Sequence, residues 1–178
     1  MRITISGPPG SGKTTACKKL SEKLGMRFVV FGQFFRELAA ERNMTLAEFG
    51  ALAEKDPSID RMVDDKILEV ALENPDIILE SRLSAYMLHN NNVPAFKIYL
   101  CASPNVRMGR VGIREGEDLK EIYRQTEERQ SSEAKRYMMY YNIDIEDKSV
   151  YDLILNTDNL TPDGVVDSIL EAIGDRTC

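Results

Sequence analysis

The residues with the clearest chemical potential form a glycine-rich run near the start of the chain. Residues 7–14 match the pattern G-x-x-x-x-G-K-[ST] at every fixed position. In such a loop, successive backbone N–H groups surround a phosphate chain, and the N-terminus of the following helix adds positive potential. We expect Lys13 to reach the β- and γ-phosphates and the Thr14 hydroxyl to bind Mg²⁺, which prefers hard oxygen ligands. The loop predicts bound ATP with Mg²⁺, and its expected ATP contacts are Gly7, Pro8, Pro9, Gly10, Ser11, Gly12, Lys13, Thr14 and Thr15.

A second set of charged residues follows two predicted strands. Arg36 lies one turn into a predicted helix, where its guanidinium can hold a second phosphate through two hydrogen bonds. Glu80 and Arg82 end the third predicted strand, at the carboxyl edge where open α/β sheets bind ligands. Glu80 is placed to position a water on Mg²⁺, and Arg82 to meet an acceptor phosphate. The alternative for each is a solvated charge on a helix or loop, and the residues alone leave both open.

A third feature is the arginine pattern in the charged segment that follows residue 104. Arg107, Arg110 and Arg114 are spaced three and four apart and therefore share one helix face. Arg129 and Arg136 are two helical turns apart. Several arginines brought together in this way would place positive charge over a bound phosphate chain.

We expect two helices joined near Gly116 to carry these arginines as a mobile lid. Phosphoryl transfer needs positive charge on the transferred group and exclusion of water, and such a lid supplies both. The alternative is a solvated helix pair, in which the arginines form ion pairs with nearby glutamates. Those glutamates are Glu115, Glu127, Glu128 and Glu133.

The elements that must position these residues alternate in type along the chain. Short apolar runs predict strands at residues 2–6, 27–31, 76–80, 95–100 and 151–155. A helix over residues 13–24, ended by Gly25, separates the first two strands, and an amphipathic helix covers residues 161–173. Strand, helix and strand in this order predict a parallel α/β sheet with helices on both faces.

A long helical stretch lies between the second and third predicted strands. Residues 33–74 read as helical, with breaks near Asn43 and Met44 and again at Asp56 and Pro57. Thr45, with Glu48 three residues later, matches a capping box, and Ser58 is a weaker start signal. This is more helix than a plain crossover needs, so we expect an insertion over the sheet edge.

Composition excludes several classes of protein. The chain has 178 residues, which suits one domain, and its net charge of -6 argues against a dedicated nucleic-acid binder. Its three cysteines form no metal or disulfide pattern, and no apolar run approaches the about 18–20 residues of a membrane span. A strand begins at once after Met1, without a signal peptide, so we expect a cytoplasmic protein. His89, the single histidine, lies in a polar run and is expected in a loop.

The phosphate-binding loop alone does not distinguish kinases from other nucleotide hydrolases. A GTPase should carry a base-reading N-K-x-D run, and residues 156–158 (Asn-Thr-Asp) lack the lysine. A larger ATPase needs more chain. The residues therefore favour a small-molecule P-loop kinase.

The whole chain resembles the nucleoside-monophosphate kinases, and in detail the archaeal type of cytidylate kinase. The resemblance is carried by GPPGSGKTT, FRELAAERNMTLAEFG, ILESRLS and, most distinctively, RYMMYYNIDIEDKSVYDLILNT. It implies a single domain over residues 1–178 with a five-stranded parallel sheet in the order 2-3-1-4-5. Residues 33–74 would bind the acceptor nucleotide, and residues 104–148 would form the lid.

The resemblance also implies roles for single residues. Arg36 and Arg82 would hold the acceptor phosphate. The transferring phosphate would be held by Arg110, Arg129 and Arg136, alongside Lys13. Ser81 departs from the family pattern, where glycine is expected between the acid and the arginine, and this puts the roles of its neighbours in doubt.

The activity implied is transfer of the ATP γ-phosphoryl group to CMP or dCMP, giving CDP or dCDP. Nucleotides would be the only partners, without nucleic acid, membrane or an obligate protein partner. The base would be read in the helical segment after Gly32, where Asp60, Arg61 and Asp64 are either readers or a solvated helix face. The alternatives are a P-loop kinase for AMP, UMP or a hydroxyl acceptor, and an ATP-binding sensor without transferase activity.

Overall fold

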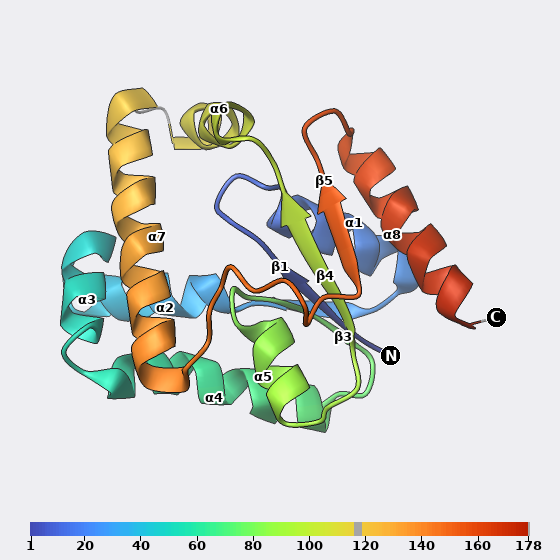
Figure 1. The fold of residues 1–178 in the computed structure, drawn as a ribbon, viewed down its shortest axis with the longest axis horizontal. Coiled ribbons are helices and arrows are strands. Elements are labelled where there is room, and N and C mark those ends of the chain that lie inside the picture. Colours follow the sequence, from blue (N-terminus) through green and yellow to red (C-terminus); the bar gives the residue numbers. More distant parts are fainter. Residues whose placement is uncertain (116–118, 178) are drawn as a thin grey trace.

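A parallel sheet with helices on both faces organises the computed structural model, which describes residues 1–115 and 119–177 (Figure 1). The sheet order within this part of the chain is β2-β3-β1-β4-β5, as predicted, and all four neighbouring pairs are parallel. The strands are β1 (Arg2–Ser6), β2 (Arg27–Val30), β3 (Ile77–Glu80), β4 (Phe96–Cys101) and β5 (Leu153–Asn156).

The helices connect these strands and build the layers around them. They are α1 (Lys13–Leu24), α2 (Phe31–Glu41), α3 (Leu46–Ala53), α4 (Pro57–Glu73), α5 (Ser84–Asn90), α6 (Pro104–Glu115), α7 (Leu119–Tyr141) and α8 (Pro162–Thr177). In Figure 1, α6 lies beyond the arrowheads of β4 and β5, and α7 runs alongside α3. No helix of the described residues is both long and apolar enough to cross a membrane.

Two hydrophobic clusters fix the sheet between its helical layers. Ile78 belongs to the cluster that β1 forms with α1 and α8, whereas Ile77 and Leu79 belong to the cluster with α4 and α5. Successive side chains of a strand point to opposite faces, so an unbroken apolar run is what a strand covered on both sides requires. Polar residues follow the carboxyl ends of the strands, beyond these clusters.

Capping residues set the starts of α3 and α4. Thr45 forms the predicted capping box: its hydroxyl accepts from the Glu48 N–H at 3.2 Å, and the Glu48 carboxylate accepts from the Thr45 N–H at 2.8 Å. The start of α4 differs from expectation, because Asp56 is the cap and accepts from the Ser58 N–H at 3.0 Å. Pro57 then occupies the first turn, where its missing N–H costs nothing.

Some expected boundaries were wrong. Phe31 opens α2 instead of ending β2, and burial of its ring in the α4–α5 cluster accounts for the early turn into helix. His89 lies in the last turn of α5, a seven-residue helix that the sequence analysis did not predict, and not in a loop. The predicted joint at Gly116 and the side chain of Arg114 fall outside the described residues.

Candidate active site

The loop between β1 and α1 is held so close to its neighbours that its glycines are required. Gly7 and Gly10 have φ angles of 143° and 80°, which side chains rarely adopt. A Cβ atom at Gly7 would overlap the carbonyl oxygen of Leu100, and one at Gly10 would overlap that of Arg107. The loop therefore packs directly against the end of β4 and the start of α6.

A cavity of about 550 Å³ opens on this loop at the carboxyl edge of the sheet. Its lining combines loop residues with side chains from α2, β3 and α6 and with apolar residues such as Leu160 and Val165. The lining residues are Gly10, Ser11, Gly12, Lys13, Thr14, Thr15, Ala16, Arg36, Glu80, Arg110, Val111, Thr157, Leu160, Pro162 and Val165. One space thus brings together most of the predicted loop residues with Arg36 and Arg110.

Lys13 is the cationic centre of the loop. Its Nζ donates to the carbonyl oxygen of Pro8 at 2.9 Å. Burial lowers the pKa of Lys13 to about 8. The negative charge of Glu80 acts to raise this pKa, and the positive charges of Arg82 and Arg129 lower it further. A lysine that is poorly solvated and surrounded by other cations gains strongly from an anion brought to it.

The residues present fit a magnesium ion held partly through phosphate. Glu80 is buried, and its Oε2 atom has no hydrogen-bond partner, although it lines the same cavity as the exposed hydroxyl of Thr14. An unpaired buried carboxylate oxygen is costly, so it indicates an absent donor such as metal-bound water. Within the described residues, no three His, Cys, Asp or Glu side chains gather as a metal site.

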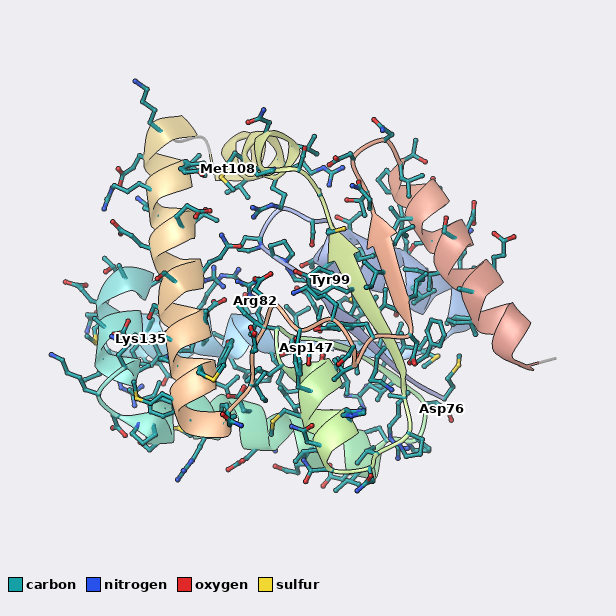
Figure 2. All side chains as sticks on the ribbon, in the orientation of Figure 1. Asp76, Arg82, Tyr99, Met108, Lys135 and Asp147 are labelled. Carbon is teal, nitrogen blue, oxygen red and sulfur yellow. The ribbon has the colours of Figure 1, made fainter. Side chains whose placement is uncertain are left out.

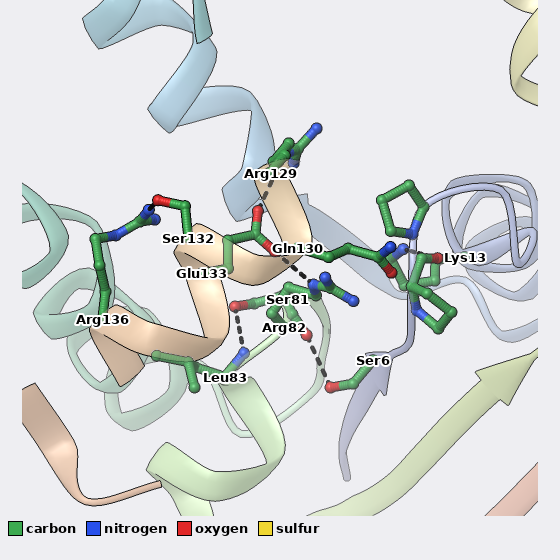
Figure 3. A network of polar contacts seen from close by, with 12 residues as sticks. Ser6, Lys13, Ser81, Arg82, Leu83, Arg129, Gln130, Ser132, Glu133 and Arg136 are labelled. Carbon is green, nitrogen blue, oxygen red and sulfur yellow. Dashed lines mark hydrogen bonds and ion pairs between the residues drawn. The ribbon is translucent and has the colours of Figure 1, made fainter. Parts of the chain in front are cut away.

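Ser81, the one departure from the family pattern, is built into the loop after β3. Its hydroxyl accepts from the Leu83 N–H at 3.0 Å, and its carbonyl accepts from the Ser6 hydroxyl at 2.7 Å (Figure 3). These bonds tie the end of β3 to the end of β1. Serine here adds a local hydrogen bond that glycine lacks, and the next residue, Arg82, pairs with Glu133 of α7.

Arg82 and Arg129 converge on one carboxylate. The Nε of Arg82 donates to Glu133 Oε2 at 2.7 Å, and the Nε of Arg129 donates to Glu133 Oε1 at 3.0 Å. Figure 3 shows the carboxylate between the two guanidiniums, with Lys13 beyond Gln130. Arg82 itself lies between α7 and the sheet (Figure 2).

Burial would raise the pKa of Glu133, but Arg82 and Arg129 outweigh it and lower the pKa to about 2. Glu133 is 6% exposed. It is therefore a buried, ionised carboxylate. The sequence analysis considered it only as one of several possible partners in a solvated ion pair.

Arg136 and Arg110 have other partners. Arg136 donates through Nε to Asp60 Oδ2 at 2.7 Å and through Nη1 to Ser132 Oγ at 2.7 Å. Arg110 donates through Nη1 to Thr157 Oγ1 at 2.9 Å and through Nη2 to the Thr157 carbonyl at 2.7 Å. The structure thus brings Arg82 and Arg129 together on Glu133, whereas Arg110 bonds to Thr157 and Arg136 bonds to Asp60, close enough for its charge to act on Glu133 as well.

Thr157 is a site residue that the sequence analysis did not identify. Its Oγ1 lies 3.1 Å from the Ser11 carbonyl and 3.2 Å from the Cys101 carbonyl, and it lines the cavity. It links the phosphate-binding loop, β4 and Arg110. Its position directly after β5 could have identified it from the sequence, because ligand-binding residues follow the carboxyl ends of strands in such sheets.

Two acids of α4, Asp60 and Asp64, are buried. Burial raises the pKa of Asp60 despite its bond to Arg136, and it raises the pKa of Asp64 to about 7 despite a 2.8 Å bond from the Tyr141 hydroxyl. One interpretation of this segment was a solvated helix face. Arg61 is exposed and fits that interpretation, but Asp60 and Asp64 do not, because they are buried.

A second cavity, of about 520 Å³, also opens on this loop. It is lined by Gly7 and Pro8, by residues at the end of β4 and the start of α6, and by residues of α7. Arg82 and Arg107 both line it. Arg82 thus contacts a different cavity from Arg36, its predicted partner on the acceptor phosphate.

The sheet order and the loop between β1 and α1 define a P-loop kinase fold. Solved structures with this fold include an uncharacterised protein from Eubacterium ventriosum, with a TM-score of 0.71 at 19% identity. Shikimate kinase from Bacteroides thetaiotaomicron gives a TM-score of 0.63 at 18% identity. Both alignments cover 98% of each chain, and at this identity they show the fold alone.

The sequence relatives define the family. Residues 2–159 match the cytidylate kinase-like family, and the chain belongs to this family. It is 47% identical to the cytidylate kinase of Methanocorpusculum labreanum, over 97% of this chain and 98% of that one. It is 42% identical to the cytidylate kinase of Archaeoglobus fulgidus, over 97% of this chain and 94% of that one.

Proposed function

We propose that this chain is a cytidylate kinase, which transfers the γ-phosphoryl group of ATP to CMP or dCMP and releases ADP. The observation that carries this proposal is the full-length similarity to archaeal cytidylate kinases, in a chain whose P-loop cavity has the parts that phosphoryl transfer needs. The cavity is lined both by Lys13 and Thr14 of the loop and by apolar side chains, among them Leu160 and Val165. These two kinds of lining suit the triphosphate and the base of one nucleotide.

The donor side of the reaction falls to the loop. Its backbone N–H groups and the N-terminus of α1 would hold the triphosphate, and Lys13 would neutralise the β- and γ-phosphates. Thr14 and, through water, Glu80 would hold Mg²⁺, which when bound neutralises charge on the phosphates. The pKa of Lys13 is about 8 in the free chain. The negative charge of an approaching ATP would raise this pKa and so favour the charged ammonium group.

The acceptor side falls to the helical segment over residues 33–74, with the lid over residues 104–148 in the same single domain. Arg36 and Arg82, which line separate cavities in this structure, would come together on the acceptor phosphate, one oxygen of which attacks the γ-phosphorus while the bond to the leaving ADP breaks. Arg110, Arg129 and Arg136 would stabilise the charge on the transferred group. No covalent enzyme intermediate is needed, because alignment and positive charge suffice for this reaction.

The lid arginines would reach the transferred group by changing partners. Arg136 would leave Asp60 and Arg110 would leave Thr157, each exchanging a protein oxygen for a phosphate oxygen. Asp60 would then be free to take part in recognition of the base. Since ATP, Mg²⁺ and nucleoside monophosphates are cytoplasmic metabolites, we place the enzyme in the cytoplasm, acting without nucleic acid, membrane or a protein partner.

The test is a coupled assay of ADP release with purified protein, Mg²⁺-ATP and a panel of acceptors. We expect kcat/KM to be highest with CMP and dCMP. Higher kcat/KM with AMP or UMP would make it a different nucleoside-monophosphate kinase. Transfer to a hydroxyl acceptor such as shikimate would overturn the acceptor assignment, and ATP binding without transfer to any acceptor would make it a sensor.

A further inference from the structure

We propose that Glu133 is a positioning residue for the phosphoryl-transfer site, where its carboxylate holds Arg82 of the β3–α5 loop and Arg129 of the lid in one fixed arrangement. This inference rests on the proposed function, because it concerns the orientation of Arg82 and Arg129, to which that function assigns roles. Nothing in the catalytic roles set out above requires a carboxylate at this point of α7.

The geometry is that of a bridge between two parts of the fold. The two oxygens of Glu133 are divided between the arginines, at 2.7 Å from Arg82 Nε and 3.0 Å from Arg129 Nε. Arg82 follows a core strand, whereas Arg129 and Glu133 belong to α7. One carboxylate therefore ties α7 to the catalytic edge of the sheet, and it joins an acceptor-side arginine to a lid arginine (Figure 3).

Charge balance explains why an acid is needed there. Arg82, Arg129 and Glu133 all act on the charge of Lys13, so three cations share this small region before any phosphate arrives. Side chains of like charge repel strongly where little water screens them. Glu133, which is 6% exposed, joins the Glu80 carboxylate in offsetting part of this repulsion, and it is the one that contacts both arginines.

The contacts also leave part of the bound arginine available for a phosphate. Glu133 takes the Nε atom of Arg82, and Arg82 Nη2 is buried without a hydrogen-bond partner. A buried donor without an acceptor is costly, so it indicates a site prepared for an absent acceptor. Glu133 thus orients the guanidinium through one atom and leaves another to meet an anion.

The test compares Glu133→Gln with the wild type in steady-state assays with ATP and CMP. The amide keeps the shape but removes the charge. By analogy with residues that orient metal ligands, whose loss typically costs 10–100-fold, we expect kcat to fall about 10- to 100-fold. We expect the KM for ATP to change little, and Glu133→Asp to recover part of the kcat.

A background without the arginines separates positioning from a general structural role. In Arg82→Met/Arg129→Met, Glu133 has nothing left to orient, so adding Glu133→Gln should lower kcat no further. An equal fall in both backgrounds, or a wild-type kcat in the single variant, would overturn the proposal. A lower KM for CMP with unchanged kcat would also overturn it, because Glu133 would then compete with the acceptor instead of positioning its arginines.

The matched control is Glu128→Gln, which removes a carboxylate from the exposed side of the same helix, where Glu128 pairs with Arg124. Its kcat should equal that of the wild type. Thermal melts of every variant show which of them fold, and Glu133→Asp carries the test if Glu133→Gln does not. The comparison uses whichever acceptor the wild type phosphorylates best. The role of Glu133 can therefore still be tested if CMP is not the preferred acceptor.

Discussion

Arg136 on α7 and Asp60 on α4 form an ion pair of 2.7 Å in the interior, where their side chains are only 3% and 4% exposed. The Arg136 guanidinium also lies 5.5 Å from the ring centroid of Phe35 on α2. Arg136 therefore connects α7 to α4 and α2. In our proposal, the same arginine leaves this ion pair to meet the transferred phosphate.

Arg136→Met should accordingly affect both stability and catalysis. Breaking a buried ion pair on one side leaves an uncompensated charge, so we expect a loss of about 3–5 kcal/mol in the free energy of unfolding. The double variant Asp60→Asn/Arg136→Met should recover part of that loss, because neither charge remains. Urea unfolding of the single and double variants measures it.

Lys135→Met is the control for that prediction, since Lys135 forms an exposed pair with Glu54 at 2.5 Å. Exposed pairs contribute about 0–1 kcal/mol, so its unfolding should resemble that of the wild type. If Arg136→Met unfolded at the same urea concentration as Lys135→Met, the buried pair would make no net contribution to the free energy of unfolding.

Lys13→Ala should keep the fold and lose transfer. The ammonium is poorly solvated, which the lowering of its pKa to about 8 reflects, so its removal should not lower the melting temperature. We expect kcat to fall on the order of 10²-fold or more, as for other groups that stabilise a charged transition state. Lys18→Ala, an exposed lysine of the same helix, should retain full activity. Normal turnover in Lys13→Ala would remove the basis for assigning the loop to ATP.

The same lysine predicts how activity depends on pH. A pKa of about 8 means that the free enzyme loses the Lys13 charge as pH rises through 8, so kcat/KM for ATP should decline above that value. Bound ATP favours the charged form, so the decline in kcat itself should lie at higher pH. A kcat/KM that stays flat from pH 7 to about 10 would show that Lys13 keeps its charge in the free enzyme.

Asp64 predicts how stability depends on pH. Burial raises its pKa from 3.8 to about 7, so between these values the folded chain holds a proton that the unfolded chain releases. The free energy of unfolding should therefore fall as pH rises from about 4 to 7. Asp64→Asn should lack this fall, and at pH 8 it should be more stable than the wild type.

Asp65→Asn, at the exposed neighbouring position, is the control for that comparison and should follow the wild type at every pH. Parallel pH curves for wild type and Asp64→Asn would mean that Asp64 is ionised in the folded state throughout.

Local patterns allowed most of the fold to be predicted. The loop at residues 7–14 has fixed spacing, and each strand is an apolar run between polar ends, so the α/β class could be read from the residues. The capping box of Thr45 and Glu48 depends on residues three apart, which a single sequence displays directly. The strand order has no such local signal, and its prediction rested on the family resemblance.

The charge pairs of the site could not be predicted, because they join residues far apart in the sequence. Arg82 and Glu133 are 51 positions apart, and Arg136 and Asp60 are 76 apart. Only the pair of Arg129 and Glu133 had a local signal, namely its spacing of one helical turn, and that spacing is typical of exposed pairs as well. Burial distinguishes the two cases, and it depends on the packing of α7 against the rest of the fold.

The most direct test of the account is a competition for one enzyme. Equimolar CMP, UMP and AMP are incubated with limiting Mg²⁺-ATP and the wild-type chain, and the diphosphates are separated by ion-exchange chromatography, with Lys13→Ala as the blank. Cytosine and uracil present opposite donors and acceptors at two ring positions, and each mismatched buried polar group costs about 1–3 kcal/mol. We therefore expect CDP to form in large excess over UDP, while AMP is not consumed and ADP equals the CDP formed, because each transfer releases one ADP from ATP. Predominant formation of UDP, or equal consumption of CMP and AMP, would contradict the assignment as a cytidylate kinase.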